Sequence, residues 1–223
     1  MNINWSSRFA YAIGLLTADG CLLNDGRHID FTSKDHAQVK TFKRCLGLKT
    51  KIGIKHSGIG NPYHRVQFSD VLFYRFLIDI GLLPAKSKTI KSVSVPDQYF
   101  FDFVRGYFDG DGSSSTFYDS QWKNSLRFYI SFASASPIFL GWLRIKLCES
   151  IGIKGFINDC GKSALQLRYG KRESTILAEH MYYSPDVCCL RRKSLKIKKT
   201  LCIIYTGRSG EIGKHAAFRT QSP

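Results

Sequence analysis

The chain has 223 residues, of which 43% are hydrophobic and 13% aromatic, and this composition excludes a wholly disordered protein. It carries 33 lysines and arginines against 17 aspartates and glutamates, a net charge of +16 at pH 7. This charge favours a polyanionic partner, with an ordinary basic surface as the alternative. No apolar run reaches the ~20 residues of a membrane span, so no membrane association is expected.

The N-terminus and the cysteines indicate the compartment. The opening MNINWSSRF has no basic stretch followed by an apolar one, so we expect an intracellular protein that is not secreted. The cysteines lack the CxxC spacing of a zinc site and are expected to be reduced thiols; they are Cys21, Cys45, Cys148, Cys160, Cys188, Cys189 and Cys202.

The first half of the chain predicts a helix followed by alternating strands and helices. The helix carries Ala12–Gly20, whose sequence is Ala-Ile-Gly-Leu-Leu-Thr-Ala-Asp-Gly. Periodicities of 2 and 3.6 residues then predict strands at 21–23 (weakly), His28–Thr32, Lys51–His56 and Tyr63–Phe68, and helices at Ala37–Leu46 and Val71–Ile80.

The second half repeats this order. Val104–Gly112, with the sequence Val-Arg-Gly-Tyr-Phe-Asp-Gly-Asp-Gly, shares the pattern x-x-Gly-x-x-x-small-Asp-Gly with Ala12–Gly20. Collinear matches follow: Phe31–Asp35 with Phe132–Ser136, and Lys86–Lys91 with Lys193–Lys198. Strands are predicted at Leu126–Phe132, Gly155–Asp159 and Ala164–Tyr169, and helices at Ile138–Ile151 and Glu173–Tyr182. The sequence therefore predicts an α+β fold of two αββαββα repeats, 1–95 and 96–206, with a flexible tail at 207–223.

Small residues on the two motif helices predict a close contact between the repeats. Gly14 and Ala18 are four residues apart and share one helix face, as do Gly106 and Gly110. Such spacing allows two helix backbones to approach closely, so these four residues are predicted to form a helix seam. The glycines that follow, Gly20 and Gly112, are expected to supply the C-terminal caps of the two helices.

If the two helices run parallel, Asp19 and Asp111 meet at the end of the seam. Two carboxylates there would repel each other and the negative ends of the helix dipoles, and a divalent cation would relieve both effects. Carboxylate and carbonyl oxygens suit Mg²⁺, so the predicted metal ligands are Asp19, Asp111 and the carbonyls of Ala18 and Gly110. For either Asp-Gly pair alone, an ordinary turn after a helix is the alternative.

The strands predict a polar face opposite the face that packs on the helices. Ile52 and Ile54 are assigned to the packed face. Because Arg and Gln read purine edges in the major groove, the polar face is predicted to bind DNA, with a solvated sheet face as the alternative. The predicted contacts are His28, Asp30, Thr32, Lys51, Lys55, Arg65, Gln67, Arg127, Tyr129, Ser131, Gln166 and Arg168, and the basic run Arg191, Arg192, Lys193, Lys196, Lys198 and Lys199 is predicted to flank the duplex.

Phe103–Gly112 and Tyr11–Gly20 resemble the paired motifs of the LAGLIDADG homing endonuclease family in its single-chain, two-repeat form. The first-repeat motif departs at Thr17, where many members carry Asp. The resemblance implies a monomer with pseudo-two-fold symmetry, in which two saddle-shaped antiparallel sheets, with helices on one face, bind a long double-stranded DNA target. It also implies Mg²⁺-dependent double-strand cleavage across the minor groove, with Mn²⁺ able to substitute and Ca²⁺ able to bind without supporting cleavage.

The same resemblance implies catalytic roles for Asp19, Asp111, Lys34, Lys86 and Lys193. Lys88 and Arg192 are neighbouring alternatives to the last two lysines. The second-repeat counterpart of Lys34 is Ala135, which predicts that the two strands are cut at unequal rates. Two alternative functions stay open: an RNA-binding maturase that acts on intron RNA, and a DNA-binding regulator that has lost cleavage. Keeping both aspartates favours cleavage.

Overall fold

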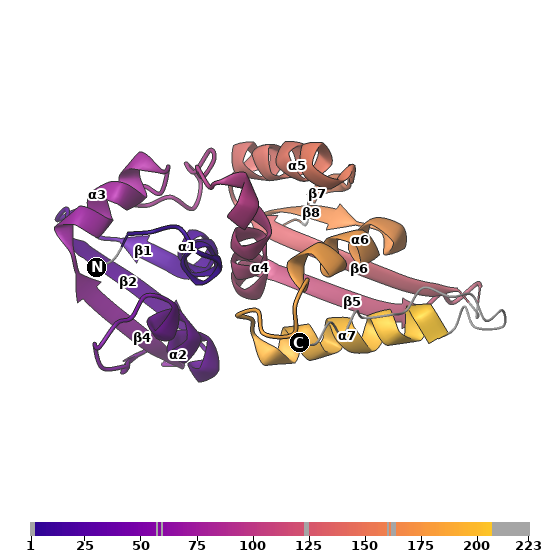
Figure 1. The fold of residues 1–223 in the computed structure, drawn as a ribbon, viewed down its shortest axis with the longest axis horizontal. Helices are drawn as coiled ribbons and strands as arrows, with labels where there is room; N and C mark the ends of the chain where they lie inside the picture. Colours follow the sequence, from indigo (N-terminus) through magenta and orange to yellow (C-terminus); the bar gives the residue numbers. More distant parts are fainter. Residues whose placement is uncertain are drawn as a thin grey trace, which may run out of the picture.

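Two repeats of similar architecture make up the described part of the chain (Figure 1), which comprises residues 3–56, 58, 60–122, 125–159, 161 and 164–206 of a computed structural model. The predicted tail at 207–223 lies outside these residues. The first repeat contains α1 (Ser7–Asp19), β1 (Gly20–Leu22), β2 (His28–Ser33), α2 (His36–Cys45), β3 (Gly53–His56), β4 (Pro62–Ser69) and α3 (Val71–Asp79). The second contains η1 (Asp97–Tyr99), α4 (Phe100–Asp111), β5 (Gly112–Tyr118), β6 (Leu126–Ser134), α5 (Pro137–Ile151), β7 (Phe156–Asp159), β8 (Leu165–Tyr169), α6 (Lys171–Met181) and α7 (Arg191–Thr206).

Each repeat forms its own antiparallel sheet with the same strand order. The orders are β1-β2-β4-β3 and β5-β6-β8-β7. The predicted α+β architecture of two αββαββα repeats is therefore confirmed. Equivalent helices also begin in equivalent ways: Asp35 caps α2 through the Ala37 amide at 3.1 Å, and Ser136 caps α5 through the Phe139 amide at 3.3 Å.

Helix α7 extends the second repeat beyond the common pattern and lies along β5 (Figure 1). Its basic run is the one predicted to flank the duplex, with a solvated helix face as the alternative. Within the described ranges, no helix is both long and apolar enough to cross a membrane.

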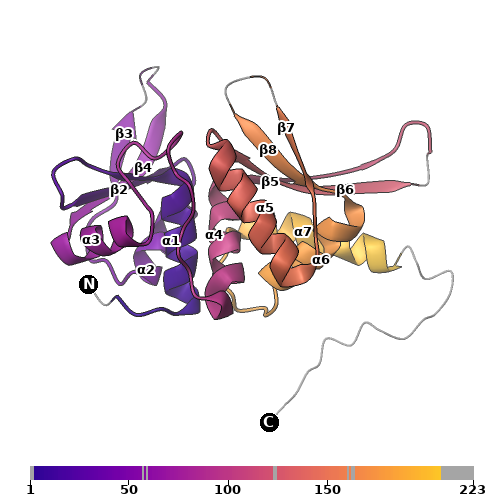
Figure 2. The same cartoon turned by 90° about the horizontal axis from the view of Figure 1, so that it is seen from above.

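The core lies between the helices and one face of each sheet. Ile29 and Phe31 of β2, and Ile130 and Phe132 of β6, are completely buried, as the alternation predicts. The prediction is wrong for β3, because Ile54 is 64% exposed and the strand begins at Gly53, not Lys51. β3 is an edge strand that projects away from the helices with β4 (Figure 2), so neither of its faces is covered.

Candidate active site at the seam between the repeats

Helices α1 and α4 lie side by side and form the contact between the repeats (Figure 2). A Cβ atom added to Gly14 would lie 2.1 Å from the Phe103 carbonyl oxygen, and one added to Gly106 would lie 2.1 Å from the Tyr11 carbonyl oxygen. One turn further along both helices, a Cβ on Gly110 would lie 2.3 Å from that of Ala18. The structure thus brings the four predicted seam residues together. Gly14 faces Gly106 and Ala18 faces Gly110, so the two helices run parallel.

The glycines after the two helices cap the helix ends, as predicted: the Gly20 amide donates to the Leu16 carbonyl, and the Gly112 amide donates to that of Phe108. Gly20 has φ −82° and Gly112 has φ −89°, so neither adopts the left-handed cap conformation. Instead, a Cβ on Gly20 would lie 2.5 Å from the Leu16 carbonyl oxygen, and one on Gly112 would lie 2.5 Å from that of Phe108. Each glycine is required because the chain turns back tightly against the helix to enter the first strand of its sheet.

Asp19 and Asp111 end the two helices at the same end of the seam. A Cβ on Gly110 would lie 3.0 Å from the Asp19 carboxylate oxygen, so this carboxylate contacts the residue that precedes Asp111. Burial, together with the negative charge of Asp111, raises the pKa of Asp19 to about 6. Burial against the seam also raises the pKa of Asp111, although this residue remains exposed on its outer side. Among the described residues, no hydrogen-bond donor pairs with either carboxylate.

This donor set fits a hard divalent cation. The described part of the chain has no group of three or more His, Cys, Asp or Glu side chains that could hold a metal ion. A cation would therefore depend on the carboxylates of Asp19 and Asp111, on backbone carbonyls and on water, which are the oxygen ligands that Mg²⁺ accepts. Of the two predicted carbonyl ligands, that of Gly110 already accepts a hydrogen bond from Lys193 at 3.2 Å.

Two lysines reach the same end of the seam, one from each repeat. The Lys86 ammonium donates to the carbonyl of Gly20, and that of Lys193 donates to the carbonyl of Gly112 at 2.6 Å. Lys193 also donates to the Phe108 carbonyl at 2.7 Å and thus neutralises the end of α4. Burial lowers the pKa of Lys86, and burial lowers that of Lys193 to about 8. The predicted pair of lysines is therefore brought to the carboxylates, in symmetric positions.

A hollow of about 80 Å³ lies beside Asp111 and is lined in part by Lys86, Tyr107, Ser134 and Ala135. Lys34, the first-repeat counterpart of Ala135, is exposed, and its Nζ lies 5.4 Å from the centroid of the Tyr63 ring. The structure therefore does not bring Lys34 to the carboxylates, and its predicted catalytic role has no geometric support.

On the first sheet, the predicted DNA-contacting residues are linked to one another through Asp30. This carboxylate is buried, accepts a hydrogen bond of 2.8 Å from Arg65 Nε, and forms an ion pair of 2.8 Å with Arg65 Nη2. Lys55 lies at 4.0 Å, and the Thr32 hydroxyl lies at 3.4 Å. Gln67 pairs with Asp30 across the strands and is partly exposed. Asp30 is therefore a positioning residue for Arg65 rather than an exposed contact. His28 bonds instead to Asp25, and Lys51 precedes the strand.

On the second sheet, aromatic and basic side chains stack across three strands. The Arg168 guanidinium lies 3.8 Å from the ring centroid of Tyr129, whose other neighbour is Phe117 at 6.0 Å between centroids. Ser131 pairs with Arg168 in the strand register. Arg127 forms an ion pair of 2.8 Å with Asp119, and Gln166 lies two residues before Arg168 on β8, on the same face of the strand. This sheet presents a more aromatic surface than the first.

The basic run on α7 divides between the two repeats. Lys196 donates to the Ser114 carbonyl of β5, whereas Arg192 reaches the first repeat and pairs with Asp35 at 3.2 Å. Arg191, Lys198 and Lys199 are exposed. Arg192 thus joins the repeats rather than replacing Lys193 at the seam.

Several buried polar residues that were not among the predicted site residues support the seam. Asp109 accepts hydrogen bonds from the Tyr11 hydroxyl at 2.7 Å and from the Leu190 amide at 2.6 Å. Gln38 donates to the Asp109 carbonyl at 2.9 Å, and Arg105, which is fully buried, pairs with Asp102. An arginine and an extra aspartate within an apolar motif helix were the available signals, since buried charges require partners.

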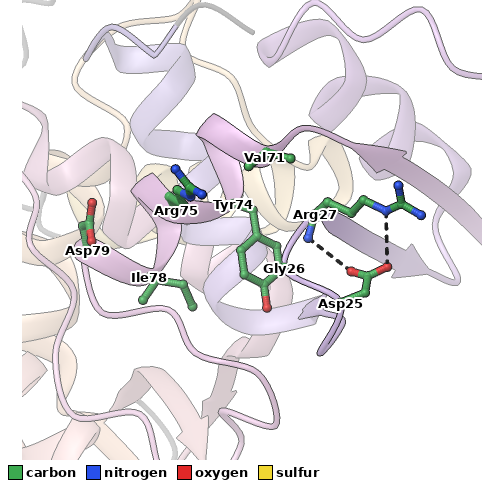
Figure 3. Close-up of a pocket in the computed structure, with 8 residues that line it drawn as sticks. All are labelled: Asp25, Gly26, Arg27, Val71, Tyr74, Arg75, Ile78 and Asp79. Atoms are coloured by element: carbon green, nitrogen blue, oxygen red, sulfur yellow. Dashed lines mark hydrogen bonds and ion pairs between the residues drawn. The ribbon is translucent and has the colours of Figure 1, made fainter.

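A larger groove of about 530 Å³ lies at the outer side of the first repeat (Figure 3). Figure 1 places α3, which forms one wall, on the side of this repeat opposite to α4. The groove is lined by Asp25, Gly26, Arg27, Val71, Tyr74, Arg75, Ile78 and Asp79. It is therefore separate from the carboxylates at the seam.

Comparisons with known proteins identify the fold. No protein-family model and no curated protein matches the sequence. Among solved structures, I-SmaMI bound to uncleaveable DNA aligns with a TM-score of 0.62 at 15% identity, covering 92% of each chain. I-AabMI bound to uncleaved DNA aligns with a TM-score of 0.62 at 12% identity, covering 91% of this chain and 92% of that one.

The similarity extends beyond proteins named as endonucleases. The N-terminal LAGLIDADG domain of DUF199/WhiA aligns with a TM-score of 0.54 at 15% identity, covering 83% of this chain and 87% of that one. Each of these alignments spans both repeats within a single partner chain. The paired Gly…Asp-Gly helices, the two sheets and these alignments agree, and the chain therefore has the two-repeat LAGLIDADG fold.

Proposed function

We propose that this protein is a sequence-specific homing endonuclease that hydrolyses both strands of a long DNA target across the minor groove. The observation that carries the proposal is the convergence of Asp19 and Asp111, one from each repeat, at the end of the seam. A protein that only binds DNA gains nothing from two crowded carboxylates with raised pKa values. The DNA complexes of I-SmaMI and I-AabMI support double-stranded DNA as the partner.

The side chains at the seam divide the chemistry between them. Asp19 and Asp111 would hold a divalent cation, Mg²⁺ or Mn²⁺, which would supply charge neutralisation and an activated water at the phosphate. Lys86 and Lys193 hold the strand that follows each aspartate and place a positive charge where the phosphorane-like transition state gains negative charge. Because each repeat contributes one aspartate and one lysine, each is expected to act on one DNA strand.

Binding and base reading belong to the open faces of the two sheets. Arg65, held by Asp30, and Arg168, stacked on Tyr129, are oriented before DNA arrives, which lowers the entropy lost on binding. A single chain with both repeats is sufficient for this arrangement, so we propose a monomer. With a net charge of +16, affinity should come largely from phosphate contacts and fall steeply with salt.

The test is a cleavage selection on a randomised duplex library in Mg²⁺, followed by binding and cleavage assays on the selected target. Asp19→Asn and Asp111→Asn should abolish double-strand cleavage while duplex binding in Ca²⁺ stays close to that of the wild type. Asp97→Asn is the matched control, because Asp97 is an exposed residue at the opposite end of α4. Full cleavage by either seam variant would refute the metal assignment.

The match to the DUF199/WhiA domain favours one alternative, a DNA-binding protein without cleavage on the same fold. Selective duplex binding that yields no nicked product in Mg²⁺ or Mn²⁺ would support this alternative. The endonuclease relatives described above are complexes with DNA, and they lend no support to intron RNA as a partner.

A further inference from the structure

Two thiols from different repeats meet at one edge of the seam. Cys45 is the last residue of α2, and Cys188 lies in the segment between α6 and α7. Their sulfur atoms are 3.6 Å apart, although the residues are 143 positions apart in the sequence. Both cysteines are partly exposed, so small molecules in solution have access to them.

The backbone around each thiol is held by buried contacts. The Cys188 carbonyl accepts a hydrogen bond from the Arg105 guanidinium at 2.7 Å, and the Leu190 amide donates to Asp109 at 2.6 Å. On the other side, α2 is anchored by Phe42, which is fully buried and stacks on Phe31 at 4.3 Å between centroids. The approach of the two sulfur atoms is therefore fixed by the packing of the repeats.

The surroundings give the two thiols opposite properties. The hydrogen bond from Cys45 lowers the pKa of Cys188 to about 6, against the effect of burial, and the guanidinium groups of Arg44, Arg8 and Arg105 act in the same direction. The pKa of Cys45 is raised, because it donates this hydrogen bond and is more buried. Cys188 is therefore the better nucleophile of the pair, and Cys45 is the neighbouring thiol that donates to it.

We propose that Cys45 and Cys188 are a dithiol–disulfide couple that links the two repeats covalently when a low-molecular-weight disulfide, such as glutathione disulfide, oxidises it. The Cys188 thiolate attacks one sulfur of the small disulfide, which forms a mixed disulfide and releases one thiolate. Cys45 then loses its proton to solvent and attacks the Cys188 sulfur, which releases the second thiolate. Two protein thiols are oxidised and one small disulfide is reduced to two thiols.

The geometry requires only a small movement for this step. A disulfide bond is about 2 Å long, so the two sulfur atoms, now 3.6 Å apart, must approach by less than the width of one atom. The link would close a loop of 143 residues and join α2 to the segment that leads into α7. Because long closed loops restrict the unfolded chain most, the oxidised protein should melt at a higher temperature than the reduced protein.

The experiment compares the wild type with Cys45→Ser, Cys188→Ser and Cys189→Ser after incubation of the folded proteins with glutathione disulfide. After acid quenching, non-reducing peptide mass spectrometry should find Cys45 linked to Cys188 in the wild type. The Cys189→Ser variant is the matched control, since it keeps the pair and removes the adjacent thiol, and it should form the same link. Cys45→Ser should instead retain a glutathione adduct on Cys188.

A melting curve provides a second measurement that does not depend on the variants. Oxidation should raise the melting temperature of the wild type, and dithiothreitol should reverse the rise. A disulfide between Cys188 and Cys189, or stable glutathione adducts on Cys45 and Cys188 without a link, would overturn the proposal. Neither measurement involves DNA, so the result is independent of the proposed nuclease activity.

Discussion

Gly14 and Gly106 face each other across the seam so closely that a Cβ atom on Gly14 would lie 2.9 Å from the Cα atom of Gly106. The same added atom would lie 2.1 Å from the Phe103 carbonyl, and neither obstacle is a movable side chain. The contact between the repeats is therefore a backbone contact, and any side chain larger than hydrogen must separate the helices.

We expect Gly14→Ala to lower the free energy of unfolding by about 1–3 kcal/mol, as overpacking of a core does. Gly141→Ala in α5 is the control, because an added Cβ there meets no atom within 4 Å. This control should gain roughly 0.5–1 kcal/mol, since alanine is the better helix former. Denaturation midpoints measure both changes, and a Gly14→Ala protein as stable as the control would contradict the close seam.

The raised pKa of Asp19 predicts how the Asp19→Asn substitution changes the free energy of unfolding. Because the pKa is about 6 in the folded protein and 3.8 unfolded, the folded state binds the proton more tightly, and stability is lost as pH rises through 6. In EDTA, Asp19→Asn should therefore match the wild type below pH 4. Above pH 6 it should be more stable, by about 2–3 kcal/mol for a shift of this size.

Adding Mg²⁺ should reduce this difference in stability, because the cation stabilises only the protein that keeps both carboxylates. Thermal melts at pH 4 and pH 8, with EDTA or Mg²⁺, measure the effect. Two results together would contradict repulsion between the two carboxylates. The melting temperature of the wild type would not change with Mg²⁺, and Asp19→Asn would be no more stable than the wild type at pH 8.

The two seam lysines predict opposite strand preferences. Lys86 bonds to the chain after Asp19, and Lys193 bonds to the chain after Asp111, so each supports one half of the site. Lys86→Met should slow cleavage of one strand about 10²-fold or more, and Lys193→Met should slow cleavage of the other. Lys88→Met, on an exposed neighbour of Lys86, is the control.

End-labelling each DNA strand separately measures the two rates. If both lysine variants slow the same strand, the assignment of one half-site to each repeat is wrong. The wild type itself should cut the strands unequally, because Ala135 faces the hollow beside Asp111 while its counterpart Lys34 lies against Tyr63.

The stacked Arg168 predicts a change in specificity. Arg168→Ala should weaken binding to the selected target by about 1–3 kcal/mol and relax the preference at one base pair, as loss of a base-reading arginine does. Arg172→Ala, on helix α6, is the control and should leave specificity unchanged. Binding competition over single-substitution targets measures both, and a uniform loss at all positions would assign Arg168 to a phosphate contact instead.

The sequence was sufficient to predict the repeated architecture and the meeting of Asp19 with Asp111. Both depend on local pattern: a four-residue spacing of small residues places Gly14 and Gly106 on contacting faces, and alternation places Phe31 and Phe132 in the core. Such features are readable because the period of the element alone determines which residues share a face.

Features that depend on sheet position or on distant partners could not be predicted. Ile54 fits the apolar alternation but is exposed, because only the strand order shows that β3 is an edge strand. Gly20 is the predicted helix cap, but the reason that this position requires glycine, which is the proximity of Leu16, depends on the tight turn into β1. Arg105 offered no clue to the two backbone carbonyls to which it donates, which lie at the end of α6 and in the segment beyond it.

The two repeats have separate strand ladders, so side chains on one sheet can be replaced independently of the other sheet. Every backbone pairing within a sheet joins strands of the same repeat, and the repeats meet through helix backbones at the seam. Side chains on β2 and β4 can consequently be exchanged without disturbing a single hydrogen bond of the β5–β8 ladder. Each half of this surface can be redesigned by itself, provided that the two motif helices are left untouched.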